Sequence, residues 1–264
     1  GVEIFPGFAA SDVLINDSGS ICGVTTGDMG VAKDGSKKDG YEPGVEIRAP
    51  YTLIAEGARG SLAKKLIRQF NLDEGKEPPK FGLGLKELWE ILPENHELGL
   101  VEHMVGWPLE NSTGGGGFIY HLEDNQLSIG FVVHLNYTNP YLSPFEEFQR
   151  FKTNPRVSRF LEGGKRISYG ARVISEGGIQ SVPRQVFPGG LLIGCAAGLV
   201  NVPRIKGTHN AMKSGILAAD AVFSGLTKDV FASELEVYET AWRKSWIYKD
   251  LYRVRNAKPL LSSF

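Results

Sequence analysis

GGLLIGCAAGLVNVPRIKGTHNAMKSGILAADAVFS, residues 189–224, combines an apolar run, a glycine turn, a loop with proline and a long helical pattern. The run from Gly190 to Gly194 is apolar on both faces, which predicts a strand buried within a sheet. A helix is predicted from Thr208 to Ser224, with small residues at helical spacing, namely Ala211, Gly215, Ala218, Ala219 and Val222. These residues predict a narrow face that lies close against the sheet.

The connection between this strand and this helix is the first candidate site. The helix begins there with free amide groups and the positive end of its dipole exposed. Such an end suits a flavin, because the flavin ring gains negative charge near N1 and its C2 carbonyl when it is reduced. Gly207 and Thr208 would offer the helix-end donors, and Thr208 and Asn201 the side-chain hydrogen bonds. An ordinary strand–loop–helix crossover without a ligand is the alternative.

A second turn of the same kind, AEGARGS at residues 55–61, follows a short apolar strand and precedes an amphipathic helix that runs to about Phe70. A glycine lies where the backbone must bend closely. By itself the turn also fits a capped strand-to-helix connection with a solvated arginine. The pair of turns favours a ligand site, because the two turns flank a β-rich insertion on either side of one sheet.

The remaining patterns organise the rest of the chain. A β-hairpin is predicted around the turn at 16–19, followed by a Gly- and Lys-rich loop at 33–44 and a strand at 47–55. After a charged linker at 72–80, β-like stretches predict an antiparallel sheet, at residues 81–92, 99–108, 117–122 and 127–135. Helices are predicted from an N-cap at Ser143 to about Lys152, from Pro155 to Leu161, and through most of 232–256.

Composition limits the possible functions. Lysine and arginine total 29 against 30 acidic residues, so no overall field favours nucleic acid or an anionic membrane face. No apolar run reaches the roughly 18 residues of a membrane span. Cys22 and Cys195 are too few for a zinc site or a four-thiolate cluster. A disulfide between them stays open, although the absence of a signal peptide favours a reducing compartment.

The third candidate site is TGGGGFIYH, residues 113–121, where four glycines enter a strand of the β-rich insertion. Glycines leave backbone N–H and C=O groups without side-chain cover, so a flat quinone ring could hydrogen-bond to the main chain. A flexible hairpin loop is the alternative. The five histidines show no ligand spacing, so none is expected to bind a metal.

Several long and unusual sequence words, in order over nearly the whole chain, resemble the electron transfer flavoprotein-ubiquinone oxidoreductase family. They are GVEIFPG (1–7), GLGLKELW (82–89), VGWPL (105–109), NPYLSPF (139–145), LEGGKR (161–166), GC (194–195) and NVPRIKGTH (201–209). The resemblance implies an α/β (α+β) fold, in which part of a Rossmann-like FAD domain is interleaved with an antiparallel, quinone-binding β-sheet subdomain. The implied domains are FAD-binding at 1–80 and 169–230, ubiquinone-binding at 81–168, and a helical C-terminal segment at 231–264.

The same resemblance assigns the candidate residues. FAD would contact both turns, at Gly57, Arg59, Ser61, Gly194, Cys195, Asn201, Gly207 and Thr208. Many related flavoprotein oxidoreductases carry Gly-Asp where this chain has Gly194-Cys195, but the family itself tolerates the cysteine. The hydrogen bonds of that aspartate to the ribityl chain would then fall to other groups. Ubiquinone would contact Gly115 and Gly116. The usual aromatic before these two glycines is replaced by Gly114, so one wall of the expected quinone pocket lacks its usual side chain.

The implied activity is that of an FAD-dependent oxidoreductase that passes electrons from reduced electron transfer flavoprotein to ubiquinone in the respiratory chain. The protein would lie peripherally on a mitochondrial inner membrane or a bacterial plasma membrane. A [4Fe-4S] cluster is expected in the full-length protein, with its cysteines beyond Phe264, and the G-x-G-x-x-G that cradles the FAD pyrophosphate is expected before Gly1. The chain alone is therefore expected to bind FAD poorly and to be catalytically silent.

Two alternatives stay open at this stage. A FixC-type or geranylgeranyl-reductase-type flavoprotein oxidoreductase shares the FAD frame, but would favour Gly-Asp at residues 194 and 195. A non-catalytic binding module with a vestigial nucleotide frame is the alternative from a different functional class. Reduction by electron transfer flavoprotein, with reduction of quinone, would separate these hypotheses.

Overall fold

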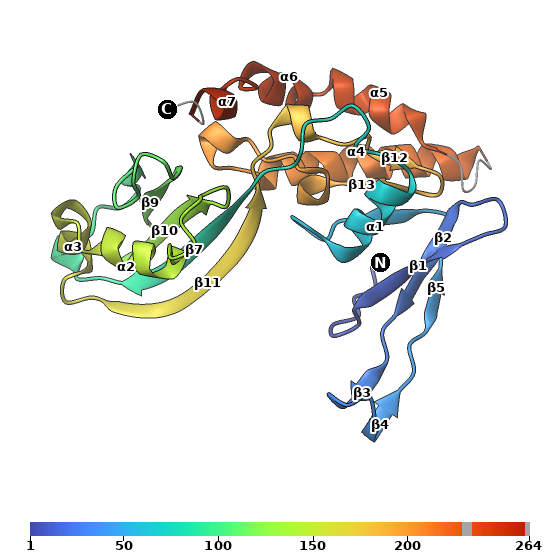
Figure 1. Cartoon of the computed structure of the whole chain (residues 1–264), viewed down its shortest axis with the longest axis horizontal. Helices are drawn as coiled ribbons and strands as arrows, with labels where there is room; N and C mark the ends of the chain where they lie inside the picture. The colour runs from blue at the N-terminus through green and yellow to red at the C-terminus, as the bar shows by residue number, and fades with distance from the viewer. Residues whose placement is uncertain (229–233, 262–264) are drawn as a thin grey trace. The chain divides into compact units, whose positions relative to one another are not determined.

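The computed structural model describes residues 1–228 and 234–261, and its contacts divide the chain into two compact units. Unit 1 comprises Gly1–Pro78 and Gly178–Arg255, and unit 2 comprises Pro79–Gly177 and the chain from Asn256 onward (Figure 1). Helices and mainly antiparallel sheets confirm the predicted mixed α/β class. The functional roles predicted for the domains stay predictions.

The first sheet of unit 1 is built on a β-hairpin. β1 (Ala10–Ile15) and β2 (Ile21–Thr26) pair antiparallel, and β5 (Glu46–Arg48) pairs with β2. The Asn16 side chain accepts hydrogen bonds from the amides of Ser18 (3.1 Å) and Ser20 (2.9 Å), which closes the turn. The predicted hairpin is confirmed.

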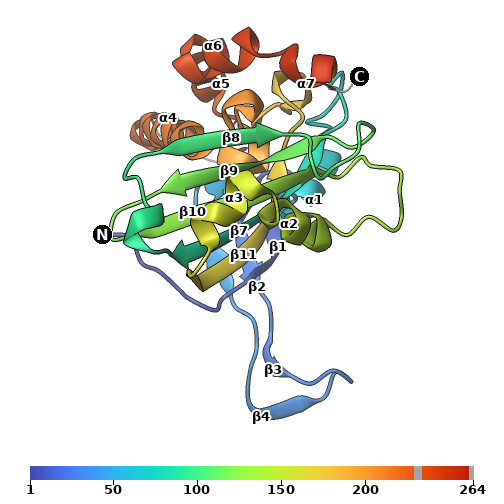
Figure 2. The same cartoon turned by 90° about the vertical axis from the view of Figure 1, so that its left-hand side faces the viewer.

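The loop predicted at 33–44 is wrong in part, because β3 (Met29–Val31) and β4 (Lys37–Glu42) pair antiparallel there. Figures 1 and 2 show this ribbon extending beyond the β1-β2-β5 sheet of the same unit. Asp34 organises its tip by accepting a hydrogen bond from the Ser36 amide (3.0 Å). Most of β4 is exposed on both faces, so no hydrophobic alternation marks this strand in the sequence.

The central sheet of unit 1 contains a parallel pair of strands. β6 (Thr52–Ile54) runs parallel to β13 (Gly190–Leu192), and β12 (Val186–Phe187) pairs antiparallel with β13. β13 is buried along its whole length, as predicted. The single strand predicted at 47–55 is wrong, because β5 and β6 belong to different sheets. Pro50 lies between them, and proline cannot donate a hydrogen bond to a ladder.

Helices complete unit 1. They are α1 (Ser61–Gln69), α4 (Thr208–Thr227), α5 (Glu236–Lys244) and α6 (Trp246–Arg253), with the short 3₁₀ turns η2 (Ile179–Ser181), η3 (Gly194–Ala197) and η4 (Val202–Arg204). The core that they form with the sheets includes Ile21, Leu66, Leu191, Tyr238 and Ile247. Tyr238 is fully buried, and burial strongly raises the pKa of its hydroxyl.

The buried face of α4 differs from the predicted one. It consists of Asn210, Ser214, Ala218, Ala221 and Gly225. The predicted stripe shares only Ala218 with this face, and Ala219 is exposed. The prediction assumed that a helix buries its apolar residues, whereas Asn210 and Ser214 are buried because their side chains bond backbone groups next to the sheet.

Unit 2 is one antiparallel sheet with two helices on one face. The strand order is β11-β7-β10-β9-β8. The bounds are β7 (Phe81–Glu90), β8 (Val101–Val105), β9 (Gly115–His121), β10 (Gln126–His134), β11 (Lys165–Ser175), α2 (Pro144–Lys152) and α3 (Pro155–Leu161), with η1 (Pro93–Asn95) and α7 (Ala257–Leu261) as short elements. Figure 2 shows α2 and α3 in front of the sheet, where they cover a core that includes Ile129, Phe131, Phe148 and Phe151. The predicted antiparallel sheet and both predicted helices are confirmed.

Among residues 1–228 and 234–261, no helix has the length and apolar character needed to cross a membrane.

Candidate functional site

Two of the predicted turns begin at the same edge of the central sheet of unit 1. β6 leads into the turn at 55–60, and β13 leads into η3. The amide of Ile193 donates a hydrogen bond to the carbonyl of Ile54 (3.0 Å), so the two turns start next to each other. Ligands of open α/β sheets bind beyond the carboxyl ends of parallel strands. The structure places five predicted FAD residues at or just beyond these two strand ends, namely Gly57, Arg59, Ser61, Gly194 and Cys195.

The turn before α1 has left-handed backbone at Gly57 (φ 80°) and at Arg59 (φ 59°). Glycine adopts this conformation freely, whereas arginine does so at a cost. Beside the turn, the Glu56 carboxylate accepts hydrogen bonds from two amides in the first turn of α1, at 2.8 and 3.3 Å. A side chain on Gly60 would collide with Glu56. The start of α1 thus already holds an anion, so we expect no ligand phosphate on its amides.

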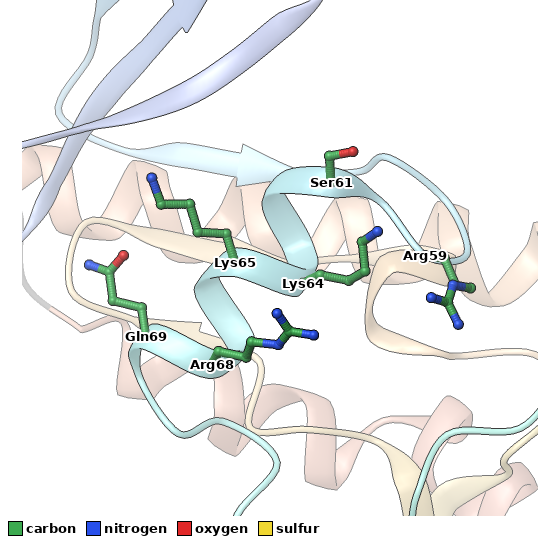
Figure 3. A pocket seen from close by; sticks show the side chains of 6 residues that line it. All are labelled: Arg59, Ser61, Lys64, Lys65, Arg68 and Gln69. Atoms are coloured by element: carbon green, nitrogen blue, oxygen red, sulfur yellow. The ribbon is translucent and has the colours of Figure 1, made fainter.

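The exposed face of α1 forms a cationic hollow of about 550 Å³ (Figure 3). It is lined by Arg59, Ser61, Lys64, Lys65, Arg68 and Gln69. In Figure 3 the side chains of Lys64 and Arg68 extend toward the side on which Arg59 lies. Lys65 points away and forms an ion pair with Asp12. Lys64 and Arg68 were not among the predicted site residues, although their helical spacing from Ser61 could have identified them.

The second turn is packed onto the first turns of α4. The amide of Gly194 donates a hydrogen bond to the Ser214 hydroxyl (3.0 Å), which in turn donates to the carbonyl of Ala211 (2.7 Å). A side chain on Gly207 would contact the sulfur of Cys195. Burial raises the pKa of the Cys195 thiol, so this group is a neutral wall of the turn.

The first amides of α4 have no side-chain cap, whereas a side chain of the loop before the helix bonds to that loop's own backbone. Gly207 is the N-cap, and no side chain of the described residues caps the helix. Thr208, the first helical residue, is exposed. Asn201 is only 1% exposed, and its side-chain oxygen accepts a hydrogen bond from the Arg204 amide (3.4 Å). Thr208 therefore faces solvent, while the Asn201 side chain is buried and holds the loop before the helix.

Two buried polar atoms near this helix start, Asn210 Oδ1 and His209 Nε2, have no hydrogen-bond partner within the described part of the chain. Asn210 is fully buried, and its nitrogen donates a hydrogen bond to the carbonyl of Leu199 (2.8 Å). The His209 ring stacks on Trp246, with centroids 5.5 Å apart. Buried polar atoms normally have partners. The uncapped helix end, the bare glycines and these two atoms therefore fit a flat ligand with polar edges, such as a flavin.

In unit 2, Gly115 and Gly116 lie at the start of β9 and are half-buried. A Cβ on Gly115 would collide with the carbonyl oxygen of Val132, and one on Gly116 with that of Met104. The Gly115 carbonyl accepts a hydrogen bond from the Gly106 amide (3.3 Å), and both glycines pair with neighbouring strands. Close approach of the strands is thus a steric reason for both glycines, and their main chain is less bare than the sequence implied.

The two cysteines are both free thiols, so the disulfide that the sequence left open is not formed. Within residues 1–228 and 234–261, no group of three or more His, Cys, Asp or Glu side chains is arranged to hold a metal ion.

Residues 81–174 match a family described as ETF-QO, ubiquinone-binding. The chain is 53% identical over 261 residues to the mitochondrial electron transfer flavoprotein-ubiquinone oxidoreductase of Oryza sativa subsp. japonica, covering 98% of this chain and 45% of that protein. It is 51% identical over 266 residues to the electron transfer flavoprotein-ubiquinone oxidoreductase of Pseudomonas aeruginosa, covering 100% of this chain and 48% of that protein. The chain therefore spans slightly under half the length of these curated relatives.

Among solved structures, the fold is similar to a geranylgeranyl bacteriochlorophyll reductase-like protein from Thermoplasma acidophilum, with a TM-score of 0.72. The two share 17% sequence identity, and the match covers 97% of this chain and 58% of that chain. At this identity, the likeness concerns the fold alone.

Proposed function

We propose that the protein carries electrons from reduced electron transfer flavoprotein to ubiquinone, because this chain belongs to the electron transfer flavoprotein-ubiquinone oxidoreductase family. The supporting observation is the identity of 53% and 51% to two such oxidoreductases over 98% and 100% of the chain. The matched residues extend through both units. The turns after β6 and β13 in unit 1 and the sheet that carries Gly115 and Gly116 in unit 2 therefore both lie within the region that is similar to these oxidoreductases.

Unit 1 would hold FAD at the two neighbouring turns. Bound FAD would supply a redox centre that accepts and releases electrons. The amides at Gly207 and Thr208, at the uncapped helix start, would donate hydrogen bonds to the polar edge of the ring, and the positive helix end would favour the negative charge of the reduced form. Asn210 Oδ1 and His209 Nε2 are the further polar atoms that such a ring could engage.

The remaining FAD residues would act on the rest of the cofactor. Gly194 and Cys195 form a tight, uncharged turn, so the ribityl chain would meet backbone groups there. Arg59, with Lys64 and Arg68 beside it, supplies the positive charge of the turn at α1. Ser61 lies at the start of that helix and offers a hydroxyl.

Unit 2 would hold ubiquinone at Gly115 and Gly116. The support is the match of residues 81–174, which include both glycines, to a ubiquinone-binding family. The complete protein would associate peripherally with the mitochondrial inner membrane or a bacterial plasma membrane. A [4Fe-4S] cluster would need ligands outside this chain, because the sequence contains only 2 cysteines.

The test uses the complete, flavin-loaded protein. Reduced electron transfer flavoprotein should bleach its flavin absorbance, and added ubiquinone should restore that absorbance with formation of quinol. Thr208→Asp should make the flavin reduction potential more negative, because a carboxylate at the helix start opposes the charge of the reduced ring. Thr227→Asp, at the last residue of the same helix, is the matched control. A protein that accepts electrons from this donor and never reduces quinone would refute the proposal.

A geranylgeranyl-reductase-type flavoprotein, the alternative that the sequence left open, is the second candidate, and its fold is compatible with this chain at a TM-score of 0.72. It predicts hydrogenation of isoprenoid double bonds by the reduced flavin. Mass spectrometry of a geranylgeranyl lipid incubated with the reduced protein distinguishes the two, because each added pair of hydrogens raises the mass by about 2 Da.

A further inference from the structure

An imidazole occupies the space that a side chain on Gly114 would need. His134 is the last residue of β10, and its amide donates a hydrogen bond to the carbonyl of Gly114 (2.9 Å). A Cβ on Gly114 would collide with Nδ1 of the His134 ring. The preceding residue of β10, Val133, pairs in register with Gly115. The ring thus comes from the neighbouring strand and lies against Gly114, the residue that precedes the candidate quinone glycines.

Glu176 holds this ring from the end of β11. Its Oε2 lies 3.6 Å from His134 Nε2, and the side chains are 3% and 18% exposed, respectively. Gly82, the register partner of His134 on β7, has no room for a side chain, because a Cβ there would collide with the Glu176 carboxylate. The facing positions on β7 and just before β9 are therefore both glycine, and the titratable group that faces the imidazole from the end of β11 is Glu176. The His134–Glu176 pair thus fills the space that the two glycines leave at this end of the sheet.

Such a pair has a chemical use at a quinone. Reduction of a quinone to a quinol takes up two electrons and two protons, one proton at each oxygen. A backbone amide can stabilise the developing negative charge, but it cannot give up its proton at neutral pH. Histidine can, because it ordinarily titrates in this range, and a carboxylate partner orients its ring. The exposed 18% of the His134 side chain gives water access for reprotonation.

We propose that His134, oriented by Glu176, forms the ring wall beside Gly115 and Gly116 and donates one proton to the reduced quinone. The inference rests on the proposed function, which supplies the electron pair from the reduced flavin. The N–H bond of the imidazolium breaks, an O–H bond forms on one quinone oxygen, and the neutral imidazole regains its proton from water. The second quinone oxygen takes its proton from solvent.

The test measures quinone reduction by the complete, flavin-loaded protein between pH 6 and pH 9. The wild type should lose kcat/KM for quinone as pH rises through the range of histidine titration, because the protonated ring is the active form. His134→Gln keeps a polar side chain of similar size, and should lower kcat about tenfold or more and remove this pH step, with little change in KM. Flavin reduction by the electron donor should be unchanged. His103→Gln, at an exposed position on β8, is the matched control.

A ring exchange between the two strands gives a second readout. Gly114→Tyr alone should raise the KM for quinone, because its ring would collide with His134. His134→Gly alone should leave a gap beside the glycines. The double variant returns a ring to the site from the residue before β9, so its KM should lie within about threefold of wild type. The pH step stays absent, because tyrosine titrates near pH 10.

The outcomes separate the inference from the proposed function. If the wild type takes up electrons and reduces no quinone, the proposed function and the role of His134 are both refuted. If the wild type reduces quinone and His134→Gln shows the same kcat and the same pH step, only the proton-donor role is refuted. If the single variant Gly114→Tyr has a wild-type KM, the ring-wall role falls.

Discussion

Replacing Lys152 with methionine should destabilise the packing of α2 on the sheet of unit 2. The Lys152 ammonium lies 2.9 and 3.0 Å from the two carboxylate oxygens of Glu87 on β7. The Trp89 indole N–H (2.8 Å) and the Arg166 guanidinium (3.2 Å) also donate to this carboxylate. The Glu87 side chain is only 3% exposed and that of Lys152 13%, so both charges are largely removed from water.

The magnitude follows from this burial. Burial alone would raise the pKa of Glu87, but the hydrogen bonds from Lys152, Trp89 and Arg166 outweigh it and lower the pKa. When Lys152 is removed, Trp89 and Arg166 still donate hydrogen bonds to the carboxylate. Breaking a buried ion pair by removing one partner costs about 3–5 kcal/mol. Arg166 remains as a second ion-pair partner of Glu87, so we expect a loss near the lower limit, about 3 kcal/mol.

Hydrogen–deuterium exchange read on peptides of β7 and α2 measures this local opening free energy. Lys165→Met, an exposed lysine at the start of β11, is the matched control and should change it by less than about 0.5 kcal/mol. The contribution of Glu87 should be complete above the ordinary glutamate pKa of about 4.3, and should be lost as pH falls through the lowered pKa. A change below about 1 kcal/mol for Lys152→Met at pH 7 would show that the ion pair does not anchor α2.

The remaining predictions concern a histidine, a hydroxyl and the chain by itself. Burial, followed by the charge of the neighbouring His96, lowers the pKa of His121. Unit 2 should therefore lose stability as pH falls below about 6.5 toward that lowered pKa. Urea denaturation at pH 7.5 and 5.5 tests this, and an equal pH dependence in His121→Phe would contradict it. Ser214→Ala leaves the buried Gly194 amide without its acceptor and should cost about 1–3 kcal/mol of stability, measured by the same denaturation against Thr227→Ala. Chain 1–264 expressed alone should bind FAD poorly, and a stoichiometric yellow cofactor that co-elutes on gel filtration would disprove this.

Local patterns in the sequence predicted much of the fold. The hairpin around Asn16 followed from a turn flanked by apolar runs, and α2 from serine and proline at its start; Asn16 and Ser143 indeed make the hydrogen bonds that close these structures. These features depend on neighbours within a few residues, which the sequence displays directly. The patterns failed where that local information was absent: β4 is too polar to show alternation, and α4 buries Asn210 and Ser214, which look like surface residues.

The site depended on contacts between distant segments. The sequence indicated both strand–turn–helix connections, and only the parallel pairing of β6 with β13 brought their turns to one sheet edge. The Glu56 carboxylate on the start of α1 and the His134 ring over Gly114 depend on which backbone lies opposite which side chain. No spacing in the sequence encodes such a partner, because it is chosen by strand order and register once the sheets have formed.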